Sequence, residues 1–188
     1  MIREVAHFVH VAPAARRLQA RMSSLDCFEL VERDLDKAGK KQFRAELVGD
    51  LDGVVLEIGT GTGLMLPHYR AGVRVVATDP DHAALARAAV RAPQSPAHVL
   101  LAEARAESLP FPDATFDAVA GASVLCTVQS MRQALSEARR VLKREGQLRL
   151  LEHVRSDRFT AGLLMDLFNP AWRALNGTWS SSGRVTPP

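Results

Sequence analysis

Three glycines at alternate positions, Gly59, Gly61 and Gly63, follow the apolar run VVLEI, and Glu57 lies two residues before the first of them. Glycine carries no side chain, so a loop built from it lets a ligand approach the main chain closely. The acid adds a negative charge beside the loop. This spacing predicts a loop that binds a nucleoside-type ligand, and a tight structural turn between a strand and a helix is the alternative.

A dinucleotide fingerprint needs glycines at the first, third and sixth positions of such a loop, and the sixth position counted from Gly59 is Leu64. A GxGxG loop preceded by an acid fits S-adenosylmethionine better, because this ligand has no pyrophosphate and its methionine part has to lie across the turn.

Asp79 follows Gly59 by twenty residues, at the end of an apolar run. An acid at a strand end can accept hydrogen bonds from both ribose hydroxyls. A helix cap is the alternative, but Pro80 and Asp81 already supply the helix start, which leaves Asp79 free for the ribose.

These residues need a sheet to position them, and five short apolar runs are long enough to be its buried strands. The runs are residues 54–58, 73–78, 98–102, 116–120 and 147–152. Helical patterns lie between them at residues 81–92, which begin with an acid suited to an N-cap, and at residues 130–142, which place apolar residues on one face. Strand followed by helix, repeated, predicts an α/β fold with a Rossmann-like, doubly wound, mostly parallel sheet.

Length, composition and net charge limit which classes of protein this chain can belong to. With 188 residues, 47% of them hydrophobic, the chain is long enough for one globular domain with a real core. A net charge of +3 is too small to imply nucleic acid as a partner. No apolar run approaches the roughly 20 residues that span a bilayer, and the first residues lack the clean apolar stretch of a secretory signal. We therefore expect a cytoplasmic protein.

The two cysteines, Cys27 and Cys126, lie far apart, and neither belongs to a CxxC pair or stands near a histidine at ligand spacing. We expect reduced thiols with no disulfide and no zinc site. No Asp and Asn cluster follows the fourth predicted strand, so a magnesium site is not expected either. The sequence therefore predicts no bound metal.

Four stretches resemble successive motifs of the class I S-adenosylmethionine-dependent methyltransferases, in the branch called methyltransferase type 11. They are VVLEIGTGTG, VVATDP, AESLPFPDATFDAVAGASVLCTV and EARRVLKREGQLRLLEHVRS, and the likeness covers about residues 25–177. The shorter motifs LPHY, VLCTV, LEHVRS and NPAW are most similar to a bacterial group related to the alkyl thiol methyltransferases of animals. They are less similar to the quinone C-methyltransferases and phosphatidylethanolamine N-methyltransferases. The resemblance implies S-adenosylmethionine as cofactor and a small lipophilic acceptor, a thiol, a quinone or a lipid-like molecule.

The resemblance also implies roles for named residues. The glycine loop would line the methionine part, Glu57 would support its amino group, and Asp79 with Pro80 would hold the ribose. The segment after the third strand would cradle the adenine, and the residues just past the fourth strand would touch the methionine end. The complete set is Glu57, Gly59, Thr60, Gly61, Gly63, Asp79, Pro80, Ala106, Glu107, Ala122 and Ser123.

Two of these positions leave alternatives open. Members of the family usually have an acid before the Ala-Glu pair at Ala106 and Glu107, and this chain has Arg105. Adenine contact would then use the amide of Ala106 and not an acidic side chain at 105. Ser123 could equally be a turn residue.

Methyl transfer from a sulfonium needs a nucleophile held in line with the methyl carbon, and positioning supplies much of the rate. A base is optional: an oxygen or carbon nucleophile would benefit from one, whereas a thiol ionises with less help. His153, at the end of the fifth predicted strand, is the best-placed candidate for a base, and a hydrogen-bonded structural histidine is the alternative. The segment GASV after the fourth strand lacks the Asn or Asp, Pro, Pro, aromatic run of amino-group methyltransferases, which disfavours DNA and glutamine substrates.

We expect residues 51–177 to form the methyltransferase domain, after a helical cap over residues 1–50 and before a disordered tail over residues 178–188. Members of the family continue past the fifth strand with a helix and two more strands, and only 36 residues follow Glu152, so we expect the last two strands to be missing. An apolar stripe over residues 159–172 is more typical of packing on a sheet than of contact with a membrane surface. Two functions stay open, an active methyltransferase and a protein that binds the cofactor without turnover. The sequence indicates no particular oligomeric state.

Overall fold

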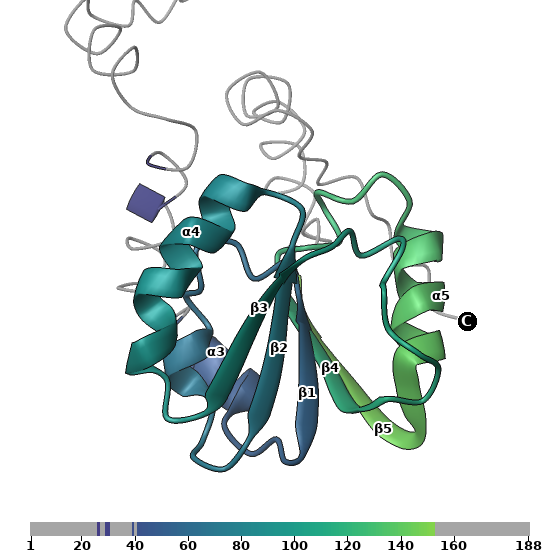
Figure 1. The fold of residues 1–188 in the computed structure, drawn as a ribbon, viewed down its shortest axis with the longest axis horizontal. Helices are drawn as coiled ribbons and strands as arrows, with labels where there is room; N and C mark the ends of the chain where they lie inside the picture. The colour runs from purple at the N-terminus through teal and green to yellow at the C-terminus, as the bar shows by residue number, and fades with distance from the viewer. Residues whose placement is uncertain (1–25, 27–28, 31–38, 40, 153–188) are drawn as a thin grey trace, which may run out of the picture.

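The structure is a computed structural model that describes residues 26, 29–30, 39 and 41–152. Within these residues five parallel strands form one sheet in the order β3-β2-β1-β4-β5 (Figure 1). The strands are β1 (Val54–Ile58), β2 (Arg74–Asp79), β3 (His98–Glu103), β4 (Phe116–Ala122) and β5 (Leu142–Leu151). The helices are α3 (Lys41–Val48), α4 (His82–Arg91) and α5 (Met131–Val141), with short 3-10 turns η2 (Leu66–His68) and η3 (Ala92–Gln94). The predicted α/β class with a doubly wound parallel sheet is confirmed.

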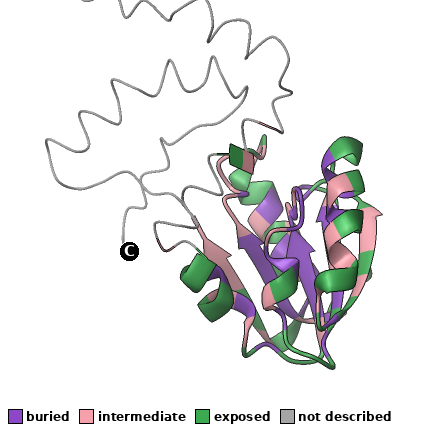
Figure 2. Ribbon diagram, turned by 90° about the vertical axis from the view of Figure 1, so that its left-hand side faces the viewer, coloured by how far each residue is buried: buried purple, intermediate pink, exposed green. Residues whose placement is uncertain are grey.

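Helices cover both faces of the sheet. Helix α3 contacts β4 and β5, and α4 contacts β2 and β3, whereas α5 lies on the opposite side and contacts β5 (Figure 1). Each face has its own buried cluster, one around Val55 and Ala88 and the other around Leu56 and Ala138. Figure 2 shows the buried sheet between helices whose outer faces are exposed. Successive residues of β1 therefore serve different cores, as side-chain alternation along a strand requires.

Polar caps set the starts of both predicted helices. The side chain of Asp81 accepts hydrogen bonds from the amides of Ala83 and Ala84, and α4 begins at the next residue. Ser130 accepts a hydrogen bond from the amide of Gln133 and precedes α5 in the same way. Side chains that accept from the first free amides of a helix stabilise its start. Both helices lie within one residue of their predicted ends.

Two strands differ from the predicted ranges by more than one residue at an end. Strand β4 continues to Ala122, because Gly121 and Ala122 still pair with Leu150 and Leu151 of β5. The expectation that Ala122 lies just past the fourth strand is therefore wrong. Strand β5 begins at Leu142, directly after α5 and five residues before its predicted start, and its register shifts between Leu142 and Gln147. The charged and exposed residues 143–145 interrupt the apolar pattern, so a search for apolar runs misses this early part of β5.

Several predictions concern segments that lie wholly or partly outside the described residues. Of the predicted cap over residues 1–50, the structure describes α3 and a few single residues. His153, the apolar stripe at residues 159–172 and the tail at residues 178–188 lie outside the described residues, so the division into domains stays a prediction. Among the residues that are described, none of the helices has the length and apolar character needed to cross a membrane. In the same part of the chain, β5 is an edge strand that pairs with β4 alone.

Candidate functional site

A cavity of about 410 Å³ lies at the carboxyl ends of β1, β2 and β4. Every residue of the predicted cofactor set lines it except Gly63. The strands bring Glu57, Asp79 and Ala122 to one edge of the sheet, and the loops that follow them complete the walls. In an open parallel sheet this edge is where ligands bind, at the point where the strand order reverses. Here that point lies between β1 and β4.

The glycine loop and the second strand meet through a hydrogen bond. The amide of Gly61 donates to Oδ2 of Asp79 over 2.8 Å, and the amide of Asp81 donates to Oδ1 of Asp79 over 2.9 Å. Asp81 caps α4, so the cap alternative for Asp79 is wrong. Each oxygen of Asp79 accepts one amide, and its role toward the ribose stays a prediction. A carboxylate oxygen can accept a second hydrogen bond, so the side chain still has capacity for two ligand hydroxyls.

Two glycines of the loop have different surroundings. A Cβ placed on Gly61, whose φ is +55°, would meet no protein atom within 4 Å, so the main chain at this position borders the open cavity. A Cβ on Gly63 would lie 3.0 Å from the Cα of Ala88 in α4. Gly63 therefore allows the loop to pack closely on the helix, and it lies outside the cavity that it was predicted to line.

Glu57 is the most deeply buried acid among the residues that line the cavity, with an exposure of 1%. Burial raises the pKa of its carboxyl to about 7, although the hydroxyls of Thr60 and Tyr69 and the charge of Arg44 lower it. Within the described residues, Oε2 of Glu57 and the hydroxyl oxygens of Thr60 and Tyr69 make no hydrogen bond of normal geometry. Buried polar atoms normally have partners, so this cluster can accept a donor from a bound ligand.

The segment after β3 reaches the cavity through Arg105, Ala106 and Glu107. Oε1 of Glu107 accepts hydrogen bonds from the amides of Gln129 over 2.6 Å and Ser130 over 3.4 Å, and Arg105 lies 3.7 Å from its other oxygen. Burial alone would raise the pKa of Glu107, but these amides and its own backbone amide bring it below its usual value. The carboxylate of Glu107 thus holds the chain at the start of α5.

Ser123 lines the cavity directly after β4 with a φ of +57°. Left-handed backbone is uncommon for a residue other than glycine. Its amide donates to the carbonyl of Leu151 over 2.7 Å. The two interpretations of Ser123 are compatible, because it is a turn residue and also a wall of the cavity.

Sequence reasoning missed several residues of this site. Arg44 of α3 is 3% exposed and lines the cavity near Glu57, and Thr127 and Val128 line it from the loop after β4. Tyr69 is buried, and its hydroxyl lowers the pKa of Glu57. No local pattern marks these residues as functional. Arg44 stands in a helical segment rich in charge, where solvent exposure is the ordinary expectation.

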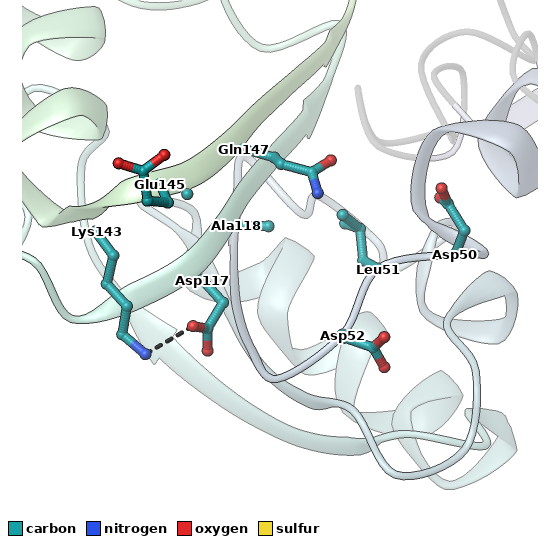
Figure 3. A pocket seen from close by; sticks show the side chains of 9 residues that line it. Asp50, Leu51, Asp52, Asp117, Ala118, Lys143, Glu145 and Gln147 are labelled. Atoms are coloured by element: carbon teal, nitrogen blue, oxygen red, sulfur yellow. Dashed lines mark hydrogen bonds and ion pairs between the residues drawn. The ribbon is translucent and has the colours of Figure 1, made fainter.

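A second cavity, of about 270 Å³, lies near the amino ends of β1 and β4 (Figure 3). It contains several acids, but Asp117 is engaged on both oxygens, by Lys143 over 2.7 Å and by the amide of Val54 over 2.9 Å. None of the predicted cofactor residues lines it. We therefore assign the candidate site to the larger cavity.

A glycine loop after the first strand, an acid at the end of the second and a cavity at the switch point define a Rossmann-like domain that binds a nucleoside-type ligand. The chain belongs to the methyltransferase-domain family, whose model matches residues 56–150. The fold agrees with a solved S-adenosylmethionine-dependent methyltransferase from Thermotoga maritima, at 23% identity and a TM-score of 0.62, with coverage of 84% of this chain and 70% of the other. The family model thus identifies a methyltransferase domain, and the solved structure agrees with its Rossmann-like fold.

Curated relatives are methyltransferases with different acceptors. The chain is 35% identical to a phosphatidylethanolamine N-methyltransferase of Cereibacter sphaeroides, over 56% of this chain and 53% of the relative. It is 31% identical to thiol S-methyltransferase TMT1B of Rattus norvegicus, over 71% of this chain and 59% of the relative. It is 40% identical to a demethylmenaquinone methyltransferase of Thermus thermophilus, over 52% of this chain and 46% of the relative. The chain thus spans about half the length of the curated relatives that it matches.

Proposed function

We propose that this protein is an S-adenosylmethionine-dependent methyltransferase that transfers a methyl group to a small lipophilic acceptor. The observation that carries the proposal is the hydrogen bond of 2.8 Å between the Gly61 amide and Asp79, which joins the predicted methionine and ribose contacts in one cavity. The proposal includes a cytoplasmic location and no nucleic acid partner, which rest on composition alone.

The residues of the cavity fit the cofactor chemically. Glu57 offers a buried carboxyl to the amino group, and Asp79 keeps capacity for the ribose hydroxyls. The bare main chain at Gly61 leaves room for the methionine part, and Ala106, the predicted adenine contact, lines the same cavity. When bound, the cofactor supplies a methyl carbon already activated by the sulfonium. The chain then has to orient the two reactants and exclude water, and such positioning can supply much of the barrier reduction.

An apolar acceptor fits the remaining walls. Leu64, Met65, Val124 and Val128 line the cavity beside the charged residues. A wall of this kind favours an apolar ligand body over a strongly hydrated one. The names of the relatives, which concern a thiol, a quinone and a lipid, support the same class of acceptor. Any role of His153 as a base stays a prediction.

Calorimetry with S-adenosylmethionine is the first test, with Gly61→Val as the matched variant. We expect the natural chain to bind and the variant to lose binding, because the new side chain would enter the cavity. A transfer assay with the tritiated methyl donor then compares an alkyl thiol, a demethylated quinol and phosphatidylethanolamine vesicles. Transfer to one of them supports the proposal, and absence of cofactor binding would contradict it.

A protein that binds the cofactor without turnover is the second candidate. The observation in its favour is that the described residues lining the cavity include every predicted cofactor contact except Gly63, and none of them is a histidine that could act as a base. Cofactor binding without transfer to any of the three acceptors would favour this candidate.

A further inference from the structure

The loop between β4 and α5 forms one wall of the cavity, through Ser123, Val124, Thr127 and Val128. Val124 sets the position of this wall against the glycine loop. A Cβ placed on Gly59 would lie 2.4 Å from Cγ2 of Val124, so the valine side chain lies directly against the bare main chain at Gly59. The distance between the two walls therefore depends on how the chain is held at Val124.

Glu152 holds the chain at this point. Its Oε1 accepts hydrogen bonds from the amides of Val124 and Leu125, both over 2.9 Å. The residue before it, Leu151, accepts the amide of Ser123 over 2.7 Å. Hydrogen bonds from amides to a carboxylate are among the stronger ones in proteins. The end of β5 thus binds three successive amides of the loop.

The loop needs such support because its backbone is strained. Ser123 has a φ of +57°, and a residue other than glycine persists in this conformation only where its surroundings hold it. Contacts inside the loop add to the turn, since the carbonyl of Val124 accepts both the amide and the hydroxyl of Thr127. Glu107 binds the other end of the loop at residues 129–130. The Leu151 carbonyl binds the strained residue Ser123, and the Glu152 side chain binds the two residues that follow it.

We propose that Glu152 is a positioning residue of the site, which holds Val124 against Gly59 and so sets the wall that faces the cofactor and the acceptor. Glu152 does not line the cavity itself, so it acts through the loop. This inference rests on the proposed methyltransferase function. It assigns a role to a residue outside the part of the chain that the family model matches.

A single oxygen of Glu152 accepts both amides, and this allows a sharp test. Glutamine can place a carbonyl oxygen at the same position without the charge, whereas alanine removes the acceptor. Positioning therefore predicts that Glu152→Gln keeps most of the function and that Glu152→Ala loses it. A role as a charged base predicts equal loss in both. Glu145→Ala is the control, because Glu145 lies on β5, the strand that Glu152 directly follows, with its side chain 94% exposed.

The experiment measures S-adenosylmethionine affinity by calorimetry, methyl transfer to the acceptor found in the screen, and hydrogen exchange at the amides of Val124 and Leu125. We expect Glu152→Ala to lower kcat/KM up to about a hundredfold, as a small misplacement of reactants can. Exchange at both amides should become faster. Glu152→Gln and the control should stay close to the natural chain, with the same pH profile of the rate.

Several outcomes overturn the inference: unchanged exchange in Glu152→Ala, natural affinity and turnover in that variant, or equal loss in Glu152→Gln. If Glu152→Ala fails to fold, Val124→Ala provides the second test, since it keeps Glu152 and removes the contact with Gly59. This variant should also lose turnover, and full activity in it would refute the proposal. Failure of the natural chain to bind the cofactor would instead count against the proposed function. The exchange rates of the Val124 and Leu125 amides would still test whether Glu152 holds the loop.

Discussion

Glu57→Gln is expected to stabilise the protein at neutral and alkaline pH while it weakens cofactor binding. Glu57 is 1% exposed, and burial raises the pKa of its carboxyl from 4.5 to about 7. Folding therefore favours the protonated acid, which glutamine resembles in size and charge. Above pH 7 the natural chain has to keep a buried negative charge that the variant does not carry.

The magnitude follows from the two pKa values. An acid whose pKa is raised in the folded state contributes stability that is fully present below about pH 4.5 and lost as the pH rises through about 7. At about 1.36 kcal/mol for each pH unit, the loss reaches about 3 kcal/mol well above pH 7. For a chain of this length, that corresponds to a difference of about 6 to 12 °C in Tm.

Thermal unfolding of the natural chain and of Glu57→Gln between pH 4.5 and 8.5 measures this difference in stability. The two free energies of unfolding should be similar near pH 4.5, and the variant should become the more stable as the pH rises. Calorimetry on the same samples should show that the natural chain binds S-adenosylmethionine more tightly with rising pH through about 7, and that the variant binds weakly throughout. Parallel stability curves would refute the reasoning, because they would mean that Glu57 ionises as easily in the folded protein as in the unfolded chain. Glu145→Gln, on an exposed side chain, is the control and should change neither curve.

Three other changes test the same structure. Gly61→Ala should cost about 1 kcal/mol of stability from its positive φ and lower cofactor affinity, since the new methyl group borders the cavity; calorimetry with unchanged affinity would contradict this. Asp79→Asn should lower the affinity for S-adenosylmethionine about tenfold or more, because an amide nitrogen would face the Gly61 or Asp81 donor; equal affinity would argue against the ribose assignment. Glu137 has its pKa lowered to about 2 by hydrogen bonds from Arg140, so its stabilising effect should be present above about pH 4.5 and lost as the pH falls through about 2. Glu137→Gln should therefore lower Tm at pH 7 and have a smaller effect near pH 2, and an equal effect at both would be inconsistent with this ion pair.

Local patterns were enough to predict the framework of the fold. The alternation of apolar strands and capped helices predicted the parallel sheet, and the glycine spacing with Asp79 predicted residues that line one cavity where β1 and β2 end. These inferences succeed because strand period, helix caps and glycine loops depend on residues close together in the chain. The same methods misplaced the start of β5, where exposed polar residues continue a strand whose pairing partner lies elsewhere in the sequence.

Tertiary structure alone decided which side chains complete the site and which support it. Arg44 is buried beside Glu57, and Glu152 binds the amides of Val124 and Leu125, although the sequence marks none of these pairs. The raised pKa of Glu57 also depends on burial, which spacing cannot reveal. The physical reason is that these effects arise between residues far apart in the chain, whose distance and solvent exposure exist only once the sheet has formed.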